Sequence, residues 1–170
     1  MKEESVVKLL LEMMKNSRRS DRDLARVLGV SQPTVTRTRQ RLEKEYIRTY
    51  TLVPLLEKIG YEIIALTFFK SKTYEKDETK KMVKSTKEWC DKHPNVIFAA
   101  EGEGLGKDAV IISLHRSYSG YADFMRQFTM DWANFATDLQ SFLVSVKDGG
   151  EMKPFDLKYL SEDQSILDRS

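Results

Sequence analysis

Side chains able to recognise nucleic acid are concentrated between residues 31 and 48. Arg37, Gln40, Arg41 and Lys44 recur at intervals of three and four residues, so one side of an α-helix would carry most of them. In the major groove, arginine can donate two hydrogen bonds to guanine and glutamine can bond adenine. Lysine and further arginines suit phosphate oxygens. The pattern predicts binding of double-stranded DNA; a basic helix face that is simply solvated is the alternative.

A helix from Gln32 to about Glu45 would position these side chains. Ser31 is a candidate N-cap, and a proline in the first turn is tolerated because its missing N–H would have no partner there. If Val35 points into a core, Leu42 lies about 20° away on a helical wheel. The basic and amide side chains then point nearly the opposite way, toward solvent.

Two shorter helices are predicted before this one. Residues 5–15 carry an apolar stripe made of Val6, Leu10, Met13 and Met14. A second helix follows Ser20, an N-cap with Asp23 three residues on, and Gly29 is placed to end it. A supporting helix and two helices joined by a tight turn form a helix-turn-helix. Its predicted DNA-binding residues are Gln32, Thr34, Thr36, Arg37, Gln40, Arg41, Lys44 and Arg48.

The segment after the third helix and the distribution of charge extend this hypothesis. Residues 47–53 are rich in β-branched and aromatic types and stop before Pro54, which predicts a short strand, the wing of a winged helix. Residues 1–50 carry twelve Lys/Arg and seven Asp/Glu, a net charge of +5, against −3 for residues 51–170. The basic part of the chain, rather than its overall charge of +2, therefore favours a nucleic-acid partner.

The remainder of the chain alternates strands and helices. Short helices or strands are expected at 55–60, 61–69, 75–93, 96–100, 109–114, 139–146 and 152–160, with an apolar helix stripe from Tyr121 to Phe135. From residue 61 to 146 the order is strand, helix, strand, strand, helix, strand, which is that of a ferredoxin-like βαββαβ domain. The fold class is therefore α+β. Because the two helices cover one face of the sheet, a second copy of the chain would most simply cover the other.

A set of residues in the first half also forms a family pattern: Asp23-Leu24-Ala25-Arg26, Gly29-Val30-Ser31, Arg37, Arg41-Leu42-Glu43, Ile47 and Tyr50. This pattern resembles the N-terminal domain of the Lrp/AsnC (feast/famine) transcription regulators, and the following element order extends the resemblance to about residue 147. It departs at Arg39, where the family usually has an apolar residue. It also lacks a glycine between the third helix and the wing.

The resemblance implies several properties. Lrp/AsnC regulators dimerise through the ferredoxin-like domain, commonly assemble further, and often bind an amino acid or similar small effector. The matching effector region holds Gly104, Gly106 and Asp108, although the family's usual Gly-x-x-Asp spacing would put the glycine at Leu105. An ordinary hairpin with glycine at positive φ and a solvated aspartate is the alternative interpretation.

The expected organisation is a winged helix-turn-helix domain over 1–53, a linker over 54–60, a ferredoxin-like dimerisation and effector domain over 61–160, and a frayed tail over 161–170. One cysteine, Cys90, and two dispersed histidines offer no disulfide or zinc site, and we expect neither a metal nor a cofactor. Without an apolar run long enough for a membrane span or a signal peptide, the expected location is the cytoplasm.

The function predicted from the sequence is a sequence-specific, homodimeric or higher-order DNA-binding regulator, modulated by an amino acid or similar metabolite. No catalytic residue is assigned. Two alternatives stay open on the same fold, an enzyme resembling the sirohaem decarboxylases, which use basic and histidine residues, and a metabolite sensor that does not bind DNA. The basic third helix favours the regulator, because such an enzyme has no need of it.

Overall fold

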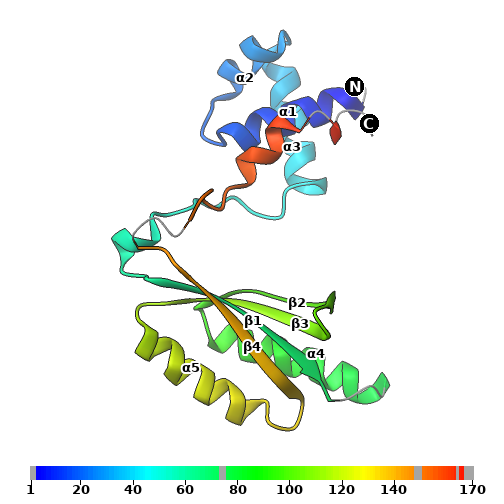
Figure 1. Ribbon diagram of the computed structural model, residues 1–170. Coiled ribbons are helices and arrows are strands. Elements are labelled where there is room, and N and C mark those ends of the chain that lie inside the picture. The colour runs from blue at the N-terminus through cyan, green and yellow to red at the C-terminus, as the bar shows by residue number, and fades with distance from the viewer. Residues whose placement is uncertain (1–2, 73–75, 148–150, 164, 167–170) are drawn as a thin grey trace. The chain divides into compact units, whose positions relative to one another are not determined.

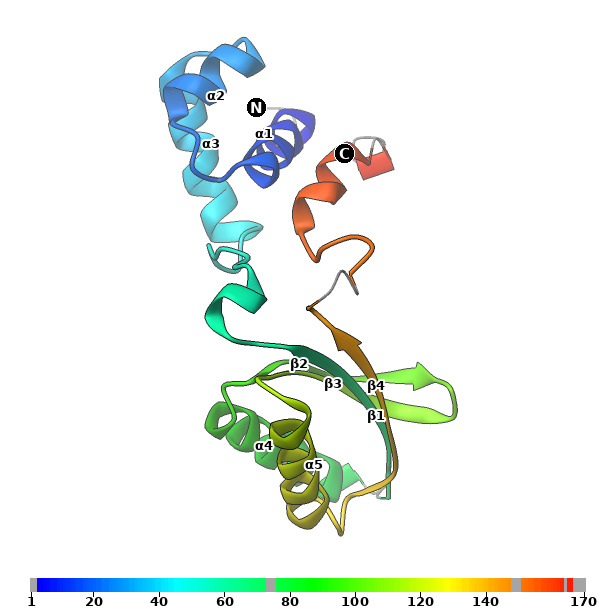
Figure 2. The ribbon, with the colours of Figure 1, turned by 60° about the vertical axis from the view of Figure 1, so that its left-hand side comes forward.

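The computed structural model describes residues 3–72, 76–147, 151–163 and 165–166, with side chains at 4–72, 83–147 and the two C-terminal stretches. The chain divides into two compact units. The first comprises Met1–Val53 and Pro154–Ser170, and the second Pro54–Lys153. Figures 1 and 2 show that the first unit is helical and that the second has two helices against a sheet.

The first unit contains the three predicted helices, α1 (Glu3–Lys15), α2 (Asp21–Leu28) and α3 (Gln32–Glu45). Their ends follow from local chemistry. The Ser20 hydroxyl accepts a hydrogen bond from the Asp23 N–H at 3.2 Å, and Ser31 does the same for the Thr34 N–H at 3.4 Å. Gly29 ends α2 at φ 66°, a conformation that residues with a side chain rarely adopt. The predicted helix-turn-helix is therefore confirmed.

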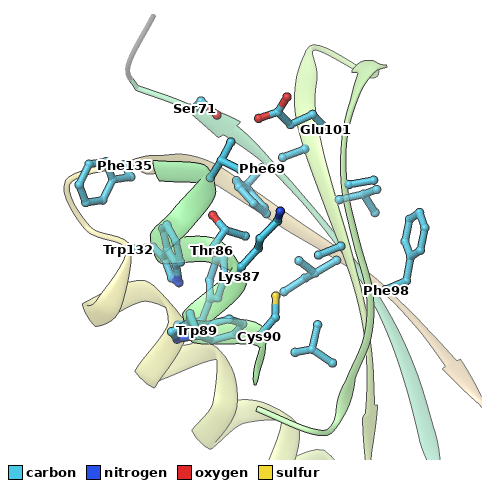
Figure 3. Close-up of a pocket in the computed structure, with 18 of the residues that line it drawn as sticks. Phe69, Ser71, Thr86, Lys87, Trp89, Cys90, Phe98, Glu101, Trp132 and Phe135 are labelled. Atoms are coloured by element: carbon cyan, nitrogen blue, oxygen red, sulfur yellow. The ribbon is translucent and has the colours of Figure 1, made fainter. Parts of the chain in front are cut away.

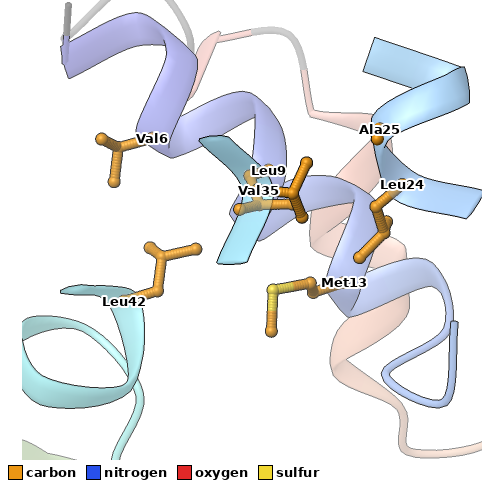
Figure 4. Close-up of a cluster of buried hydrophobic side chains, with 7 residues drawn as sticks. All are labelled: Val6, Leu9, Met13, Leu24, Ala25, Val35 and Leu42. Atoms are coloured by element: carbon orange, nitrogen blue, oxygen red, sulfur yellow. The ribbon is translucent and has the colours of Figure 1, made fainter. Parts of the chain in front are cut away.

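The core of the first unit is one apolar cluster shared by its three N-terminal helices (Figure 4). Its buried members are Val6, Leu9, Met13, Leu24, Ala25, Val35 and Leu42. Burying a leucine or valine side chain contributes about 1.5–3 kcal/mol to stability. The stripe predicted for α1 was partly wrong, since Leu9 is fully buried while Leu10 and Met14 are only half-buried. Helix α1 turns the Leu9 side toward the cluster because α2 and α3 both supply apolar side chains there.

The C-terminal segment belongs to the first unit, contrary to the expected boundary at residue 160. Leu157–Glu162 forms a short 3₁₀ helix, η2, packed against α1, where a strand and then a frayed tail were expected. Two local hydrogen bonds favour this turn: Asp156 Oδ1 accepts from the Lys158 N–H at 2.9 Å, and Ser161 Oγ donates to the Lys158 carbonyl at 2.6 Å. On a helical wheel, Leu11 lies on the side of α1 that faces away from the core. Leu11 is nevertheless buried, on the helix against which η2 packs.

The expected wing strand over residues 47–53 is absent from the described part of the chain, where residues 47–55 run without strand pairing. A strand requires a neighbour with which to exchange backbone hydrogen bonds, and no described strand lies in this unit to provide one. The segment is instead attached at two points. Ile47 packs on the core, and the Tyr50 hydroxyl donates to Glu43 Oε1 at 3.0 Å. Burial, with the Glu43 carboxylate, raises the pKa of Tyr50.

The second unit has the predicted βαββαβ order. After the 3₁₀ turn η1 (Leu56–Ile59), its elements are β1 (Ile63–Ser71), α4 (Lys76–Lys92), β2 (Val96–Gly104), β3 (Lys107–His115), α5 (Tyr118–Asp131) and β4 (Ala136–Ser145). The sheet order is β2-β3-β1-β4 and all pairs are antiparallel. This is the ferredoxin-like topology. Helix α5 ends four residues earlier than Phe135, because Trp132–Phe135 turns the chain into β4.

Helices α4 and α5 lie on the same face of the sheet (Figure 2). The core beneath them contains Ile111, Phe128, Trp132 and Ala136, with Trp89 and other half-buried apolar side chains packed around it. Trp89 joins the two helices, since its indole Nε1 donates to Asp131 Oδ2 at 2.9 Å. The predicted 75–93 helix also included Met82, whose side chain lies outside the described residues.

The other face of the sheet is apolar, and none of the described elements of its own unit covers it. The register places Leu66 of β1 opposite both Ile112 of β3 and Phe142 of β4, so these three side chains share one face. Phe98 of β2 also pairs with Ile112. Phe142 is 67% exposed and Phe98 50% exposed. The open sheet face, defined here by Leu66, Phe98, Ile112 and Phe142, is a continuous apolar surface of the kind that marks interfaces.

On the helix-covered face, His115 at the end of β3 is buried. Its Nε2 lies 2.8 Å from Ser113 Oγ, and its ring packs edge-on against Tyr121 and beside Phe124. Burial lowers the pKa of His115. The unfolded chain therefore binds a proton at this site at a higher pH than the folded chain does, and stability falls as the pH drops below about 6.5.

We predict that the His115→Gln variant loses part of this pH dependence. Thermal unfolding of the whole chain between pH 7.5 and pH 5 should show a smaller decline in Tm for the variant than for the wild type. The matched variant His93→Gln removes the other histidine and should keep the wild-type decline. If the decline is the same with and without the His115 imidazole, burial of this ring does not control acid sensitivity.

Candidate nucleic-acid interface

Helix α3 presents the predicted DNA-binding side chains on its outer surface. Val35, Thr38 and Leu42 face the core, as the helical wheel requires. The side chains of Gln32, Arg37, Gln40, Arg41 and Lys44 are all exposed, and so is Arg48 in the segment that follows. The structure thus brings these six sequence-predicted residues to the solvent side of one helix and its extension.

Two further predicted residues, Thr34 and Thr36, are only half-exposed and serve the turn itself. The Thr34 hydroxyl lies 2.8 Å from the Ser31 hydroxyl at the start of α3. The Thr36 hydroxyl donates to Asp21 Oδ2 at 2.7 Å and so ties α3 to the first turn of α2. Both hydroxyls have protein partners, which fits a role in holding the two helices together.

The outward-facing polar side chains of α3 differ in whether they have a partner within the protein. Arg41 Nε pairs with Glu45 Oε2 one turn along α3, at 2.8 Å. Within the part of the chain that the structure describes, Arg37, Gln40 and Lys44 have neither an ion pair nor a side-chain hydrogen bond. Long polar side chains without protein partners are available to a ligand, whereas Arg41 must first exchange a carboxylate for a phosphate.

Arg39, which departs from the family pattern, has a structural role. Its Nε lies 2.7 Å from Asp21 Oδ1, and its Nη2 donates a hydrogen bond to the Arg19 carbonyl at 3.0 Å. The side chain is only 19% exposed. Asp21 therefore accepts a hydrogen bond from Thr36 and forms an ion pair with Arg39, and this polar clasp fixes α3 against the start of α2. This role is not predictable from the sequence pattern, because a helical wheel does not identify partners fifteen or more residues away.

More cations lie around α2. Arg18, Arg22 and Arg26 are exposed, while Arg19 is engaged by Glu12 Oε2 at 2.6 Å. Arg18 and Arg22 therefore remain, with Arg26, as exposed positive charges on the same unit as α3.

Helix α3 ends without the glycine that the family pattern has after it. The N–H groups of Tyr46 and Ile47 both donate to the Leu42 carbonyl, and these hydrogen bonds close the end of the helix.

The candidate effector residues occupy the β2–β3 hairpin. Gly104 and Gly106 have φ values of 155° and 68°, so the turn uses the freedom of glycine. Asp108 Oδ1 accepts a hydrogen bond from the Ser71 N–H at 2.7 Å, and the buried Lys107 ammonium pairs with Asp138 of β4. The two charged side chains that follow the turn thus bind the protein itself, which favours the hairpin interpretation.

The described residues do not bring together a set of metal ligands. No three or more His, Cys, Asp or Glu side chains there converge on a point that could hold a metal ion. His93 Nδ1 lies 2.7 Å from the Trp89 carbonyl and its ring stacks on Trp89, so both histidines have partners within the second unit. None of the helices described has the length and apolarity to cross a membrane.

Comparison with known proteins supports the same interpretation. Residues 7–43 match the AsnC-type helix-turn-helix domain. No curated protein sequence matches the chain. This match confirms, for the helix-turn-helix domain, the resemblance inferred from the sequence. The matched residues cover most of α1, all of α2, and α3 up to Glu43.

Solved structures share the fold of nearly the whole chain. A transcriptional regulator from Neisseria meningitidis, in complex with L-Met, has a TM-score of 0.74 at 16% identity, covering 93% of this chain and 95% of its own. An AsnC-family regulator from Agrobacterium tumefaciens has 0.73 at 17%, covering 94% and 99%. AsnC of E. coli has 0.69 at 15%, covering 91% and 98%. The α+β fold, with a helix-turn-helix unit before a ferredoxin-like unit, is therefore established.

The polar clasp leads to a stability prediction. Arg39→Ala removes a half-buried guanidinium and leaves Asp21 with fewer partners, so we expect a loss of about 1–2 kcal/mol in the free energy of unfolding. Arg41→Ala breaks the exposed pair with Glu45 and should cost about 0.5 kcal/mol or less. Urea denaturation followed by far-ultraviolet circular dichroism measures both. Equal losses for the two variants would contradict the clasp.

Proposed function

We propose that this chain, which carries an AsnC-type helix-turn-helix domain and has the fold of the AsnC-family regulators, is a sequence-specific DNA-binding transcription regulator. The observation that carries the proposal is the outer face of α3. Arg37, Gln40 and Lys44 lie there exposed and without protein partners among the described residues. A regulator of this kind acts on the chromosome, so the proposal places it in the cytoplasm.

The roles of the side chains divide by chemistry. Arg37 and Gln40 have the donor geometry for base edges, with Gln32 at the N-terminal end of the same helix. Lys44 and Arg48, and Arg41 after release from Glu45, supply positive charge for phosphates. Thr34 and Thr36 are assigned to the turn rather than to the bases, because their hydroxyls already bond Ser31 and Asp21.

The proposal includes assembly into a homodimer through the open sheet face. This face places Leu66, Phe98, Ile112 and Phe142 together, and it is not covered by any element that the structure describes in the same unit. A symmetric sheet-on-sheet contact would bury the two exposed phenylalanines, whose transfer from water contributes about 1.5–3 kcal/mol each. Dimerisation also supplies two copies of α3, as recognition of a two-fold DNA site requires.

The proposal also includes modulation by an amino acid. It is supported by the structurally similar Neisseria regulator, whose structure contains L-Met. In this chain Asp108 already accepts the Ser71 N–H, so an amino acid at the Gly104–Gly106 turn would have to use the second carboxylate oxygen or the backbone. Any effector must bind two assembly or DNA-binding states with different affinities, because equal binding shifts nothing.

The DNA proposal predicts a separation between specificity and affinity. Arg37→Ala and Gln40→Ala should each reduce binding to the preferred duplex by about 1–3 kcal/mol and relax base preference at one position. Arg41→Ala should weaken all duplexes alike and reduce the salt dependence by about one phosphate contact. Fluorescence anisotropy across a salt series, with and without L-amino acids, measures these effects.

The control is Lys84→Ala, which removes one positive charge from an exposed position on α4 in the other unit. It should bind DNA as the wild type does. Wild-type affinity in an Arg37→Ala/Gln40→Ala double variant would contradict base recognition by α3. Absence of duplex binding by the wild type would contradict the proposal and favour a sensor or enzyme on this fold.

The assembly proposal predicts that Phe142→Glu is a monomer. Phe142 is 67% exposed within one chain, so the charge should disrupt the contact between copies without disturbing the core. Met130→Glu is the matched control, because Met130 is 66% exposed but lies on α5, behind the sheet. Sedimentation velocity at tens of micromolar should give dimers or larger species for the wild type and this control. A monomeric wild type, or a Phe142→Glu dimer, would refute the proposal.

A further inference from the structure

The second unit contains a large cavity between α4 and the helix-covered face of the sheet (Figure 3). Its volume is about 610 Å³, within the range of pockets that hold small ligands. Val83 and Ile97, on opposite sides of it, are both among the exposed apolar residues, so the cavity opens to solvent between α4 and β2. It lies within one unit and does not involve α3 or the β2–β3 turn.

Several of the side chains that line the cavity are aromatic. Phe69 of β1, Trp89 of α4, Phe128 of α5, and Trp132 and Phe135 in the turn after it all line the space. Trp89 and Phe128 pack edge to face at 5.3 Å between ring centroids, and Trp132 packs edge-on against Trp89 at 6.1 Å. Flat apolar surfaces held in this way suit an aromatic ring better than a flexible polar molecule.

Charged side chains stand at the mouth. Figure 3 shows Lys87 extending from α4 toward Phe69, while Glu101 lies at the strand side of the opening and Phe98 points away from the cavity. Asp91, one turn after Lys87 on α4, also lines the space. Among the described residues, Lys87 has no ion pair, so its ammonium is available to an anionic group that follows a ring into the cavity.

We propose that this cavity binds a small aromatic carboxylate, with the ring against the Phe69–Trp89–Trp132 wall and the carboxylate beside Lys87. Transfer of an aromatic ring from water into this apolar cavity is favourable, because the ring displaces water from the apolar walls. Asp91 and Glu101 also line the cavity, but Lys87 is the lining cation that extends toward Phe69, so it is the group that a carboxylate on a ring at this wall would meet. The site is separate from the DNA and dimer surfaces, so its failure would leave the proposed function untouched.

The cavity carries its own spectroscopic probes. The two tryptophans of the chain, Trp89 and Trp132, both line it, and so does the single cysteine, Cys90. Burial raises the pKa of the Cys90 thiol, which slows its alkylation. A ligand that fills the cavity should therefore change tryptophan emission and further protect Cys90 from iodoacetamide.

The test compares three compounds of matched size on the whole chain: phenylacetate, 2-phenylethanol and 2-phenylethylamine. Tryptophan emission excited at a wavelength that these compounds do not absorb gives the affinities, and mass spectrometry gives Cys90 alkylation rates. Phenylacetate should bind about two- to fivefold more tightly than the alcohol, as an exposed ion pair allows, and the amine should bind most weakly. Phenylacetate should also slow alkylation of Cys90.

Two variants locate the site. Lys87→Met removes the charge while keeping most of the length of the side chain, and it should remove the advantage of phenylacetate over 2-phenylethanol. Lys84→Met, on the same helix but outside the cavity lining, should not. Ala99→Phe should fill the cavity and abolish binding of all three compounds, because Ala99 pairs with the buried Ile111 and so faces the helices. If Ala99→Phe does not fold, the comparison of Lys87→Met with Lys84→Met still tests whether Lys87 binds the carboxylate of the ligand.

Two results would overturn the proposal. If none of the compounds alters tryptophan emission or Cys90 alkylation at millimolar concentration, the cavity is not a site for aromatic ligands. If the amine binds best, or if Lys87→Met leaves the order of affinities unchanged, the assignment of an anionic ligand is wrong.

Discussion

The direction in which α3 faces is the constraint on which the function of this protein depends. Val35 and Leu42, seven residues apart, are both buried against α1, and this single stripe fixes the rotation of the helix. Every outward residue is then set by the 100° step of the helix. Arg37 and Gln40 owe their exposure to that burial, so the apolar cluster of the first unit is as much a part of the proposed DNA recognition as the basic side chains are.

Polar contacts complete what the apolar stripe begins. Asp21 accepts from Thr36 and also pairs with Arg39, so one carboxylate at the start of α2 holds two side chains of α3. Burial alone would leave the angle between α2 and α3 to packing, whereas charged hydrogen bonds restrict it. The clasp makes Arg39 a positioning residue, and it explains how a charged residue is accommodated where relatives usually carry an apolar one.

Local signals predicted much of the fold. Ser20, Gly29 and Ser31 act on backbone groups within a few residues, which is why the ends of α2 and α3 were predicted correctly. The βαββαβ order followed from apolar runs in the same way. The outward face of α3 was also predictable, since it needs only the helical period and one buried reference residue.

The errors came from contacts between distant segments. The 3₁₀ helix η2 packs on α1 more than a hundred residues away, and nothing in residues 152–160 alone distinguishes that packing from a strand. The expected wing at 47–53 has β-forming residues but no described neighbour with which to pair. The partners of Arg39 and Asp108, and the aromatic cavity beside α4, likewise depend on which elements meet in space.

The most direct test of the central claim is to sequence the duplexes that the full-length protein retains from a pool of random DNA. The account predicts that the wild type enriches a defined motif and that an Arg37→Ala/Gln40→Ala variant binds DNA but loses preference at the positions those residues read. Retention of duplexes with no enriched motif, or an identical motif for both proteins, would contradict recognition by the outer face of α3.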